Sequence, residues 1–385
     1  MNMTENGKNV HNDSSLKNKR ILMVGNTEMS VFYAREEVVK AFVDKGYDVV
    51  VSFSKGVYGD GETSSKRVGC RFVETKVDGH GTNPIAELSL FCRYFRLLGK
   101  IKPDVVLTYN IKPNVYMGLA CRIKGIPYFV NITGLGTALE GKGLLQSFNL
   151  VLYKLAMKKV NCIFFQNSHN RQFFLDNGVV KEEKTVLLPG SGVNLEKYLP
   201  QEYPEDNKVK FLFASRIMKK KGIDEFLQAA KYMKEKYNGK AEFHIVGNIE
   251  DKEYEHIFEE AQKEGIATYH GHSSDMRPYY QMCSCTVLPS YYPEGMSNVL
   301  LESSASARPI ITTDRSGCRE VVDDGVNGYV VKQQDGNDLT EKIEKFFLLS
   351  WEEKRDMGLA GHEKVRREFD RQIVVGKYFS EIENL

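Results

Sequence analysis

Two acidic and two basic side chains in the second half of the chain have types and spacing that suit a ligand with both phosphate and hydroxyl groups. Glu294 and Glu302 stand eight residues apart, and Arg216 precedes Lys221 by five residues. Carboxylates accept hydrogen bonds from neighbouring sugar hydroxyls. An arginine fork and a lysine point charge together suit a diphosphate. The alternative is that the glutamates belong to an ordinary loop and helix and the cations to a solvated basic loop.

The segments around these side chains predict strand ends and a helix N-terminus. An apolar run stops at Pro289, and Ser297-Asn298 opens an apolar-periodic segment. Serine and asparagine favour the N-cap position, and the free N–H groups of a helix N-terminus attract anions. Arg216 likewise follows an apolar run, Val209–Ser215. Since open α/β sheets bind ligands at the carboxyl ends of their strands, we expect the four side chains at one edge of a sheet.

Length and composition indicate a soluble globular protein with two domains. The chain has 385 residues, of which 42% are hydrophobic and 27% charged, and this length exceeds that of a usual single domain. No apolar run approaches the ~18 residues that a membrane-spanning helix needs. The first twenty residues are polar and contain no secretory signal. Residues 1–18 are therefore expected to form a disordered leader, and the protein is expected to be cytoplasmic.

Cysteine and histidine usage predicts no metal cofactor. The seven cysteines are odd in number and lie mostly in apolar runs, which indicates free, buried thiols in a reducing compartment. Cys283 and Cys285 are too close together for a usual metal pair, and the histidines are scattered. His80 stands between two glycines, and a solvated loop histidine is favoured there over a site residue.

Charge is distributed unevenly along the chain. Residues 1–200 contain 27 Lys and Arg against 18 Asp and Glu, a formal charge of +9, and the remainder contains 26 against 33, a formal charge of −7. A basic half favours an acidic partner. Because no aromatic-and-basic nucleic-acid motif occurs, an anionic membrane surface is favoured and nucleic acid is not expected.

The first half reads as alternating strands and helices, which calls for a parallel sheet. An apolar strand ends at Gly25, and the loop at Asn26 follows it without a G-x-G-x-x-G fingerprint, which argues against a plain NAD(P) dehydrogenase. Further along, a polar loop covers Asn110–Asn114, and a loop with two glycines covers Thr133–Thr137. All three loops follow predicted strands. Their candidate ligand contacts are Asn26, Asn110, Lys112, Thr133 and Gly134.

At Lys208 the strand–loop–helix pattern starts again without repeating the sequence. The economical architecture is two Rossmann-like domains that face each other across a ligand cleft. We expect a first domain over residues 19–195, an irregular linker to about Asn207, a second domain over residues 208–360 and a last helical part over 361–385 that packs back on the first domain.

Residues 143–160 predict an amphipathic helix with lysines beside leucines and Phe148. A basic amphipathic helix can lie on a membrane surface. It can equally be a helix that faces the protein core and leaves its lysines in solvent, and the sequence leaves both interpretations open.

Taken together, several motifs resemble the GT4 family of retaining glycosyltransferases. They are Ser215-Arg216 with Lys221-Gly222, the Gly271-His272 pair, the segment from Pro289 to Glu302, the run Pro309–Thr313, and the segment from Gly317 to Gly328. The resemblance covers residues 19–380 and is strongest over 209–331. It implies a GT-B fold, a nucleotide-sugar donor and a metal-independent, retaining hexosyl transfer.

The resemblance also implies roles for individual residues. It places Arg216 and Lys221 on the donor diphosphate, Glu302 on the ribose and Glu294 on the transferred sugar. Gly295, Met296 and Ser297 would add backbone contacts. The full set of residues expected to bind the donor comprises Gly247, His272, Glu294, Gly295, Met296, Ser297, Asn298, Val299 and Glu302.

Two segments of the first half, Asn110–Asn114 and Asn131–Gly136, resemble those of bacterial enzymes that add N-acetylgalactosamine, galacturonic acid or similar sugars to lipid-linked intermediates of capsule, O-antigen or glycan assembly. Many family members carry histidines where Thr133 stands and near Asn110, and paired glycines in the first loop. These departures argue against a catalytic histidine in the first domain, and Thr133 with backbone amides is expected to serve instead. The residues expected on the acceptor side are Asn26, Asn110, Lys112, Thr133 and Gly134.

The sequence thus predicts a cytoplasmic enzyme, peripheral on the inner face of the plasma membrane, that moves a sugar of the GalNAc, GlcNAc or GalA type from a UDP-sugar to a polyprenyl-diphosphate-linked acceptor. Two alternative functions stay open. One is a UDP-sugar epimerase with the GT-B fold, which would need no acceptor. The other is a non-catalytic nucleotide-sugar-binding protein, which would bind UDP without turnover.

Overall fold

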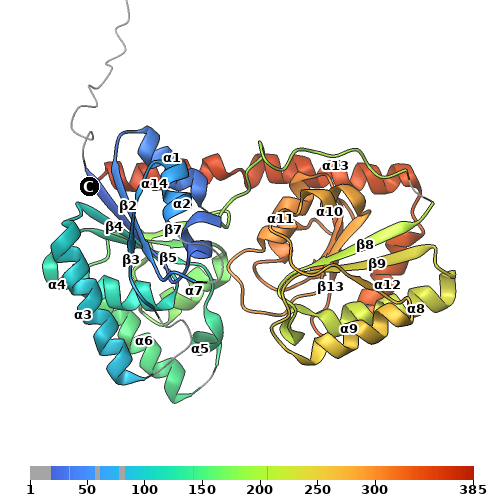
Figure 1. Ribbon diagram of the computed structural model, residues 1–385, viewed down its shortest axis with the longest axis horizontal. Coiled ribbons are helices and arrows are strands. Elements are labelled where there is room, and N and C mark those ends of the chain that lie inside the picture. The colour runs from blue at the N-terminus through green and yellow to red at the C-terminus, as the bar shows by residue number, and fades with distance from the viewer. Residues whose placement is uncertain (1–18, 34, 57–60, 78–82, 142, 206) are drawn as a thin grey trace, which may run out of the picture. The chain divides into compact units, whose positions relative to one another are not determined.

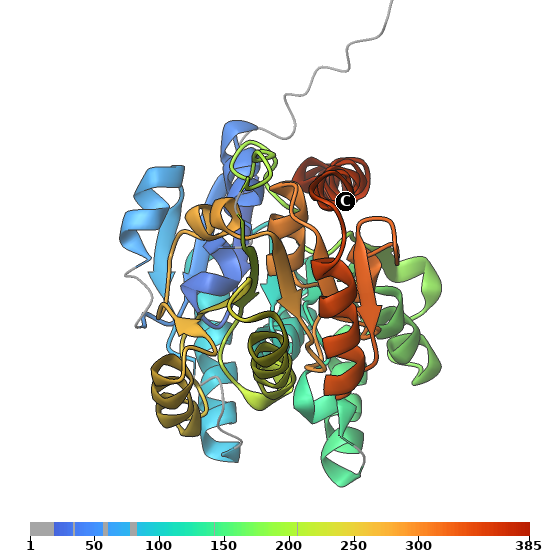
Figure 2. The same ribbon diagram turned by 90° about the vertical axis from the view of Figure 1, so that its right-hand side faces the viewer.

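The computed structural model describes residues 19–385 apart from 34, 57–60, 78–82, 142 and 206. The expected leader, residues 1–18, and the His80 loop lie outside the described residues. The described part contains two parallel β-sheets with helices packed on both faces (Figures 1 and 2). The predicted fold class, a pair of doubly wound α/β domains, is confirmed.

The first sheet has seven strands in the order β3-β2-β1-β4-β5-β6-β7, and the register between its described neighbours is parallel. Its strands are β1 (Arg20–Val24), β2 (Asp48–Phe53), β3 (Arg71–Glu74), β4 (Val105–Tyr109), β5 (Tyr128–Ile132), β6 (Cys162–Phe165) and β7 (Thr185–Leu187). The helices between them are α1 (Glu36–Asp44), α2 (Glu62–Val68), α3 (Pro84–Ile101), α4 (Gly118–Lys124), α5 (Gly136–Glu140), α6 (Leu144–Met157) and α7 (Ser168–Asp176), with π-helical turns at Met29–Tyr33 and Pro113–Met117 and a 3-10 turn at Glu182–Lys184.

The second sheet has six strands in the order β10-β9-β8-β11-β12-β13, which repeats the order of the first six strands of the other sheet. Figure 1 shows α10, α11 and α13 on one of its faces and α8, α9 and α12 on the other. Its strands are β8 (Val209–Ala214), β9 (Ala241–Val246), β10 (Thr268–Tyr269), β11 (Cys285–Leu288), β12 (Ile310–Thr313) and β13 (Gly328–Val331). The helices that follow Lys208 are α8 (Ile223–Tyr237), α9 (Glu253–Lys263), α10 (Arg277–Met282), α11 (Asn298–Ala305), α12 (Gly336–Phe347), α13 (Trp351–Glu368) and α14 (Arg371–Glu383), with 3-10 turns at Lys219–Lys221 and Arg319–Val321.

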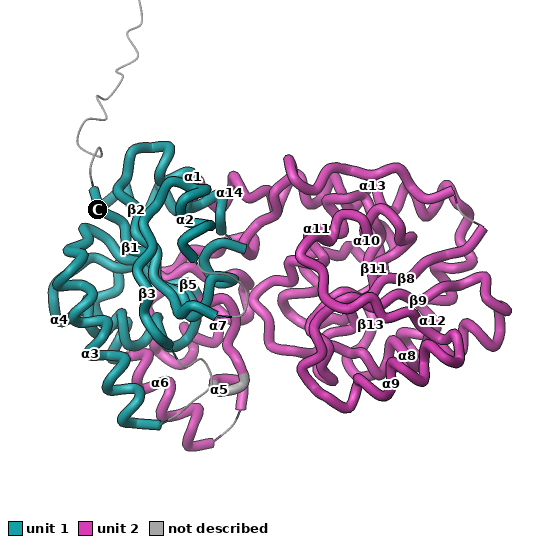
Figure 3. Tube along the Cα trace, viewed as in Figure 1, with its two compact units in different colours: residues 1–131, 155–162, 378–385 teal, residues 132–154, 163–377 magenta. Residues whose placement is uncertain are grey.

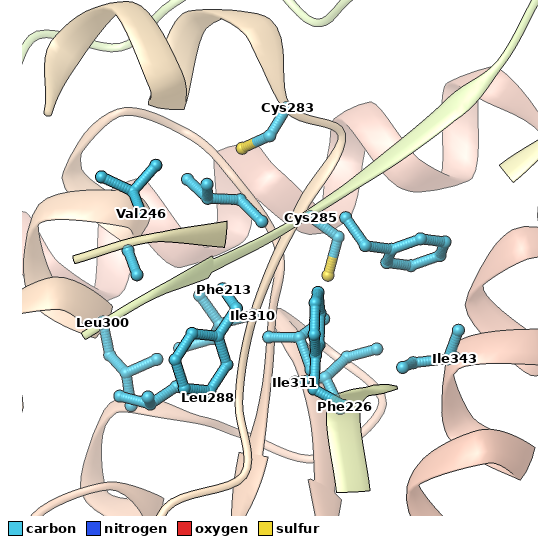
Figure 4. Packing of buried hydrophobic residues seen from close by; sticks show 14 of the residues in the cluster. Phe213, Phe226, Val246, Cys283, Cys285, Leu288, Leu300, Ile310, Ile311 and Ile343 are labelled. Atoms are coloured by element: carbon cyan, nitrogen blue, oxygen red, sulfur yellow. The ribbon is translucent and has the colours of Figure 1, made fainter. Parts of the chain in front are cut away.

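Parallel strands covered on both faces must be apolar on both sides, and β8 shows why this sequence folds so. Four consecutive residues of β8, Phe211 to Ala214, are buried. The ring of Phe213 lies 5.4 Å from the ring of Phe226 on α8. Figure 4 shows these rings among buried aliphatic side chains from the neighbouring elements, including Leu300 and Ile343.

By their internal contacts the described residues divide into two compact units (Figure 3). One unit holds the residues through Asn131 together with 155–162 and 378–385, and the other holds 132–154 and 163–377. The expected linker after Gly190 lies inside the second unit, where Val193 pairs with Asp370. The end of α14 belongs to the first unit, where the rings of Phe379 and Phe42 lie 5.1 Å apart. The domain boundaries given above stay a prediction.

Three local predictions about helices were wrong. The helix α2 was missed, because its sequence is polar and has no apolar period between Gly61 and Gly69. Helical periodicity over Phe32 to Lys45 predicts a helix there, but α1 begins at Glu36, because a π-helical turn precedes it. Serine at position 168 predicts the N-cap of α7, but the N-cap is Asn167, whose side chain accepts from the backbone N–H of Asn170. Residues 351–384 predict one helix or a broken one, and the structure has two separate helices there, α13 and α14.

The cysteines and the described helices bear on the predictions of free thiols and of no membrane-spanning segment. All seven cysteines are free thiols, five of them buried and Cys70 and Cys92 half-buried. Among the described helices, none combines the length and the apolar character needed to cross a bilayer.

A buried arginine within the second unit ties the chain before β8 to the helix α10. Arg308 is fully buried, and its guanidinium donates to the carbonyl oxygens of Tyr280 (2.6 Å), Gln201 (3.1 Å) and Glu202 (2.6 Å). Buried carbonyls that lose their donors keep the full cost of desolvation. Arg308 therefore fixes the path of residues 201–202 over α10.

Replacing Arg308 by Met should lower the free energy of unfolding by about 3 kcal/mol, because several buried carbonyls lose their donors. Urea denaturation of the full chain measures this change. Arg308→Lys should retain part of the stability, since one ammonium still donates. Arg319→Met, at an exposed position, should stay within about 0.5 kcal/mol of the parent. Equal stability of the two methionine variants would contradict this role.

Candidate active site

The candidate site lies at the point where the strand order of the second sheet reverses. Strand β8 pairs with β9 on one side and with β11 on the other. The crossovers from β8 and from β11 leave toward opposite ends of the sheet order, which is the topological switch point where open α/β sheets bind ligands. The loop after β8 supplies Arg216 and Lys221, and the loop after β11 supplies Glu294.

Lys221 and Glu294 form an ion pair that solvent hardly reaches. The ammonium of Lys221 donates to a carboxylate oxygen of Glu294, and their side chains are 8% and 13% exposed. Gly222 follows Lys221 with φ of 81°, and a Cβ there would lie 2.2 Å from the carbonyl oxygen of Pro289. Because glycine alone avoids this clash, Gly222 allows the two loops to approach.

Arg216 is brought to the same place but has its own acidic partner. Its guanidinium donates to both carboxylate oxygens of Glu250, at 2.9 and 3.1 Å. The guanidinium carbon of Arg216 lies 5.3 Å from the ring centroid of Tyr292, and the ammonium of Lys221 lies 5.0 Å from the same centroid. The structure thus gathers the predicted cation pair over one aromatic ring.

Glu302 lies on α11 and is only 6% exposed. The hydroxyl of Tyr280 donates to its carboxylate at 3.1 Å. Burial raises the pKa of Glu302 to about 7, partly offset by the hydrogen bond from Tyr280. A carboxylate enclosed in this way can accept further hydrogen bonds from the hydroxyls of a bound sugar. Ser297 stands at the N-cap of α11 as predicted, but its side chain makes no capping bond.

The loop that carries Glu294 is held by residues far away in the sequence. The side-chain amide of Asn167 donates to the carbonyl oxygens of Glu294 (3.2 Å) and Gly295 (2.6 Å). A Cβ on Gly295 would lie 2.2 Å from the Gln166 amide oxygen and 2.5 Å from the Thr133 carbonyl oxygen. Gly295 must therefore be glycine, because backbone and side chains surround it.

The loop of Thr133 and Gly134, expected to contact the acceptor, belongs to the same compact unit as Glu294. Gly134 has a φ of 151°, and a Cβ there would lie 3.1 Å from the carbonyl oxygen of Pro293. The Thr133 loop therefore contacts the backbone around Glu294 directly.

The next four residues expected to bind the donor have separate surroundings. Met296 is 9% exposed, and a Cβ on Gly190 would lie 2.6 Å from its Cβ. Asn298 accepts a hydrogen bond from the Ser191 hydroxyl at 2.7 Å. Ser297 is buried, and Val299 packs partly buried against the core of the second unit. The segment at Gly190 and Ser191 thus lies against the residues Met296 to Asn298.

The structure treats Gly247 and His272 differently. Gly247 has a φ of 150°, and a Cβ there would lie 1.6 Å from the carbonyl oxygen of Ser215, so that only glycine fits beside the end of β8. His272 is exposed, and its ring makes no hydrogen bond within the described part of the chain. Among the described residues, no hydrogen bond, ion pair or ring contact joins His272 to Arg216, Lys221 or Glu294.

In the first unit, Asn26 and Asn110 meet at the corresponding switch point between β1 and β4. The side-chain oxygen of Asn110 accepts from the backbone N–H of Asn26 at 3.1 Å, and Asn110 has a left-handed φ of 74°. The prediction of a polar loop from Asn110 to Asn114 was wrong, because the chain is helical from Ile111 onward. Lys112 bonds Glu87 at 2.6 Å.

Several side chains around the candidate site were not singled out from the sequence. Tyr292 lies inside the recognised motif, so its position could have marked it. Three other contacts come from segments outside this motif: Tyr280 contacts Glu302, Asn167 contacts the Glu294 loop, and Ser191 contacts Asn298. No local sequence pattern indicates these contacts. The contacts of these residues are decided by the folded chain.

The pKa of Glu302 makes stability depend on pH. Between about pH 4.5 and about pH 7 the folded chain keeps a proton on Glu302 that the unfolded chain has released, so stability falls as pH rises through this window. Glu302→Gln removes the ionisable group. We expect the variant to be more stable than the parent at pH 8, by at most about 3 kcal/mol, and the difference to shrink toward pH 4.5. Denaturant titrations at both pH values measure this, and a pH-independent difference would contradict the assignment.

Two family models match consecutive parts of the chain. Residues 20–167 match the model described as glycosyl transferase 4-like, and residues 196–364 match the model described as glycosyl transferases group 1. The first match spans the strands β1 to β6, and the second spans the whole second sheet with Arg216, Lys221, Glu294 and Glu302.

The chain is similar along nearly its full length to a curated bacterial enzyme. It is 28% identical, over 93% of this chain and 97% of the relative, to N,N'-diacetylbacillosaminyl-diphospho-undecaprenol alpha-1,3-N-acetylgalactosaminyltransferase of Campylobacter jejuni. It is also 26% identical, over 65% of this chain and 68% of the relative, to UDP-Gal:alpha-D-GlcNAc-diphosphoundecaprenol alpha-1,3-galactosyltransferase of Escherichia coli.

Among solved structures, the fold resembles the Anabaena protein HepE in complex with UDP and glucose. The TM-score is 0.78 at 16% identity, and the match covers 95% of this chain and 99% of the other. The two family models, the topology of both sheets and the residues gathered at the second switch point agree, and the chain belongs to the GT4-type glycosyltransferases with the GT-B fold.

Proposed function

We propose that the protein is a retaining glycosyltransferase that moves a hexose of the GalNAc, GlcNAc or GalA type from a UDP-sugar to a polyprenyl-diphosphate-linked acceptor in bacterial polysaccharide or glycan assembly. The observation that carries the proposal is the approach of Arg216 and Lys221 over the ring of Tyr292, beside Glu294. Two cations at a strand edge provide the charge that a diphosphate leaving group requires.

The donor would bind by exchange of ionic partners. In the structure, Lys221 bonds Glu294 and Arg216 bonds Glu250. The diphosphate of a UDP-sugar would take over both cations, which frees the carboxylate of Glu294 to accept from hydroxyls of the transferred sugar. The carboxylate of Glu302 would accept hydrogen bonds from the ribose hydroxyls of the donor.

The reaction would break the bond between the anomeric carbon and the diphosphate oxygen and form a bond from that carbon to the acceptor oxygen on the same face. The acceptor proton would pass to the departing diphosphate oxygen. Arg216 and Lys221 would stabilise the negative charge that grows on this group, which is the role that a metal ion plays in other transferases. We propose on this ground that transfer proceeds without a metal.

The acceptor class rests on similarity. The names of the two curated relatives describe transfer to undecaprenyl-diphosphate-linked sugars. The relative from Campylobacter jejuni matches nearly the whole of both chains, so the part of this chain that would recognise an acceptor has a counterpart there.

The helix α6 supports a peripheral position at the membrane. Five large apolar side chains of α6 are exposed, at 47% to 92% of their surface, and they recur along one side of the helix. Lysines in and just after the helix are exposed too. An exposed apolar stripe beside cations suits the interface of an anionic bilayer. The stripe comprises Leu144, Leu145, Phe148, Val151 and Leu155.

A basic surface cavity in the first unit is a second feature that favours an anionic surface. It has a volume of about 460 Å³ and lies between the end of β3 and α3. Lys76, Arg93, Arg96 and Lys100 line it, against one acid, Glu74. Clustered cations of this kind attract the headgroups of anionic lipids.

A panel of UDP-sugars scored for UDP release, with and without a polyprenyl-diphosphate-linked sugar, tests the proposed reaction. We expect release only with the acceptor and undiminished release in EDTA. Arg216→Ala and Lys221→Ala should each lower turnover about 100-fold or more, because charge on the leaving group loses a stabilising donor.

Lys219→Ala is the matched control, since its side chain is 68% exposed and contacts Asp224 at the surface; it should leave turnover within about two-fold of the parent. Conversion of a UDP-sugar without acceptor would indicate an epimerase. UDP binding without turnover of any donor would indicate a binding protein, and activity lost in EDTA and restored by Mn²⁺ would refute the metal-free reaction.

Substituting Leu145 and Phe148 by Ser should weaken binding to vesicles that contain anionic phospholipid by about ten-fold or more, because two apolar side chains no longer enter the interface. Sedimentation with vesicles measures the partition. Val326→Ser combined with Leu348→Ser removes two exposed apolar side chains elsewhere and should change little. Unchanged binding of the α6 variant would show that α6 is not the membrane contact.

A further inference from the structure

The ring of Tyr292 lies close to both cations of the candidate site. The guanidinium carbon of Arg216 is 5.3 Å and the ammonium of Lys221 is 5.0 Å from its centroid. Both distances fall within the range of cation–π attraction. One tyrosine therefore contacts both residues that would hold the donor diphosphate.

Tyr292 differs from the acidic partners of these cations in what it does when a donor binds. Glu250 and Glu294 neutralise Arg216 and Lys221, and a diphosphate must displace them. The face of an aromatic ring attracts cations without carrying a net charge, so the contact can persist while phosphate oxygens approach from the other side. The ring also offsets the repulsion between two like charges that the ligand requires near each other.

The backbone of Tyr292 is anchored on both sides, which fixes the ring. The N–H of Tyr292 donates to the hydroxyl of Ser290 at 3.3 Å. The preceding N–H, of Tyr291, donates to the carbonyl oxygen of Lys220 in the loop after β8 at 3.0 Å. Pro293 follows and is buried. The segment that carries the ring is thus attached to the segment that carries Lys221.

We propose that Tyr292 is a positioning residue that holds Arg216 and Lys221 together, at the separation needed to bind the diphosphate of the donor. The inference rests on the proposed UDP-sugar donor. It adds a residue that acts through Arg216 and Lys221 and takes no direct part in the reaction. It predicts that Tyr292 contributes to recognition of the diphosphate and contributes nothing to recognition of the nucleoside.

Calorimetry with UDP and with uridine tests this division. Tyr292→Leu should weaken UDP binding by about ten-fold, equivalent to about 1.4 kcal/mol, and leave uridine binding unchanged. Tyr292→Phe keeps the ring and loses only the hydroxyl, so UDP binding should fall by about three-fold or less. With a sugar donor and acceptor, the KM for the donor should rise in the same order.

Tyr291→Leu is the matched control, because it removes a half-buried tyrosine from the neighbouring position of the same loop and should leave UDP binding within about two-fold of the parent. Uridine binding by each variant reports whether the nucleoside part of the site is intact. A Tyr292→Leu variant that loses UDP and uridine binding equally would show a merely structural role and would overturn the proposal.

The outcomes separate this inference from the proposed function. If the parent protein binds UDP and transfers sugar while Tyr292→Leu binds UDP as well as the parent does, Tyr292 has no positioning role and the proposed function stands. Equal losses in Tyr292→Phe and Tyr292→Leu would assign the effect to the hydroxyl and overturn the role of the ring. A parent protein that binds no UDP would overturn both proposals.

Discussion

The ion pair between Lys221 and Glu294 is the contact on which the candidate site depends. Both side chains are nearly buried, so each charge needs an opposite charge beside it, and each supplies this to the other. The pair joins the loop after β8 to the loop after β11, and Gly222 makes the approach possible. A site organised in this way is already assembled, and the diphosphate of the proposed donor would enter by replacing one anion with another.

The same sheet topology appears twice and explains where polar residues gather. In each sheet the first strand lies between the second and the fourth, so two crossovers diverge from neighbouring strand ends. In the first sheet this point joins Asn26 to Asn110, and in the second it joins Lys221 to Glu294. Neutral amides in one sheet and paired ions in the other indicate different ligand chemistry at equivalent positions.

Much of the fold could be predicted because apolar runs alternate with amphipathic segments, and this pattern records burial directly. The strand β8, expected over the apolar run Val209–Ser215, was placed correctly for that reason. Prediction failed where local sequence carries no such record. The polar helix α2 is held between two glycines of positive φ, and Asn110 begins a helix through a left-handed conformation that its neighbours do not reveal.

The sequence by itself determined the two α/β sheets, the strand-end position of the candidate residues and the family motif, because each depends on local periodicity or spacing. Tertiary structure decided the rest. That Arg216 bonds Glu250, that Lys221 bonds Glu294 and that both cations share the ring of Tyr292 follows from loops meeting at a sheet edge. Such pairings depend on distances between segments far apart in the chain, which residue types and spacing do not encode.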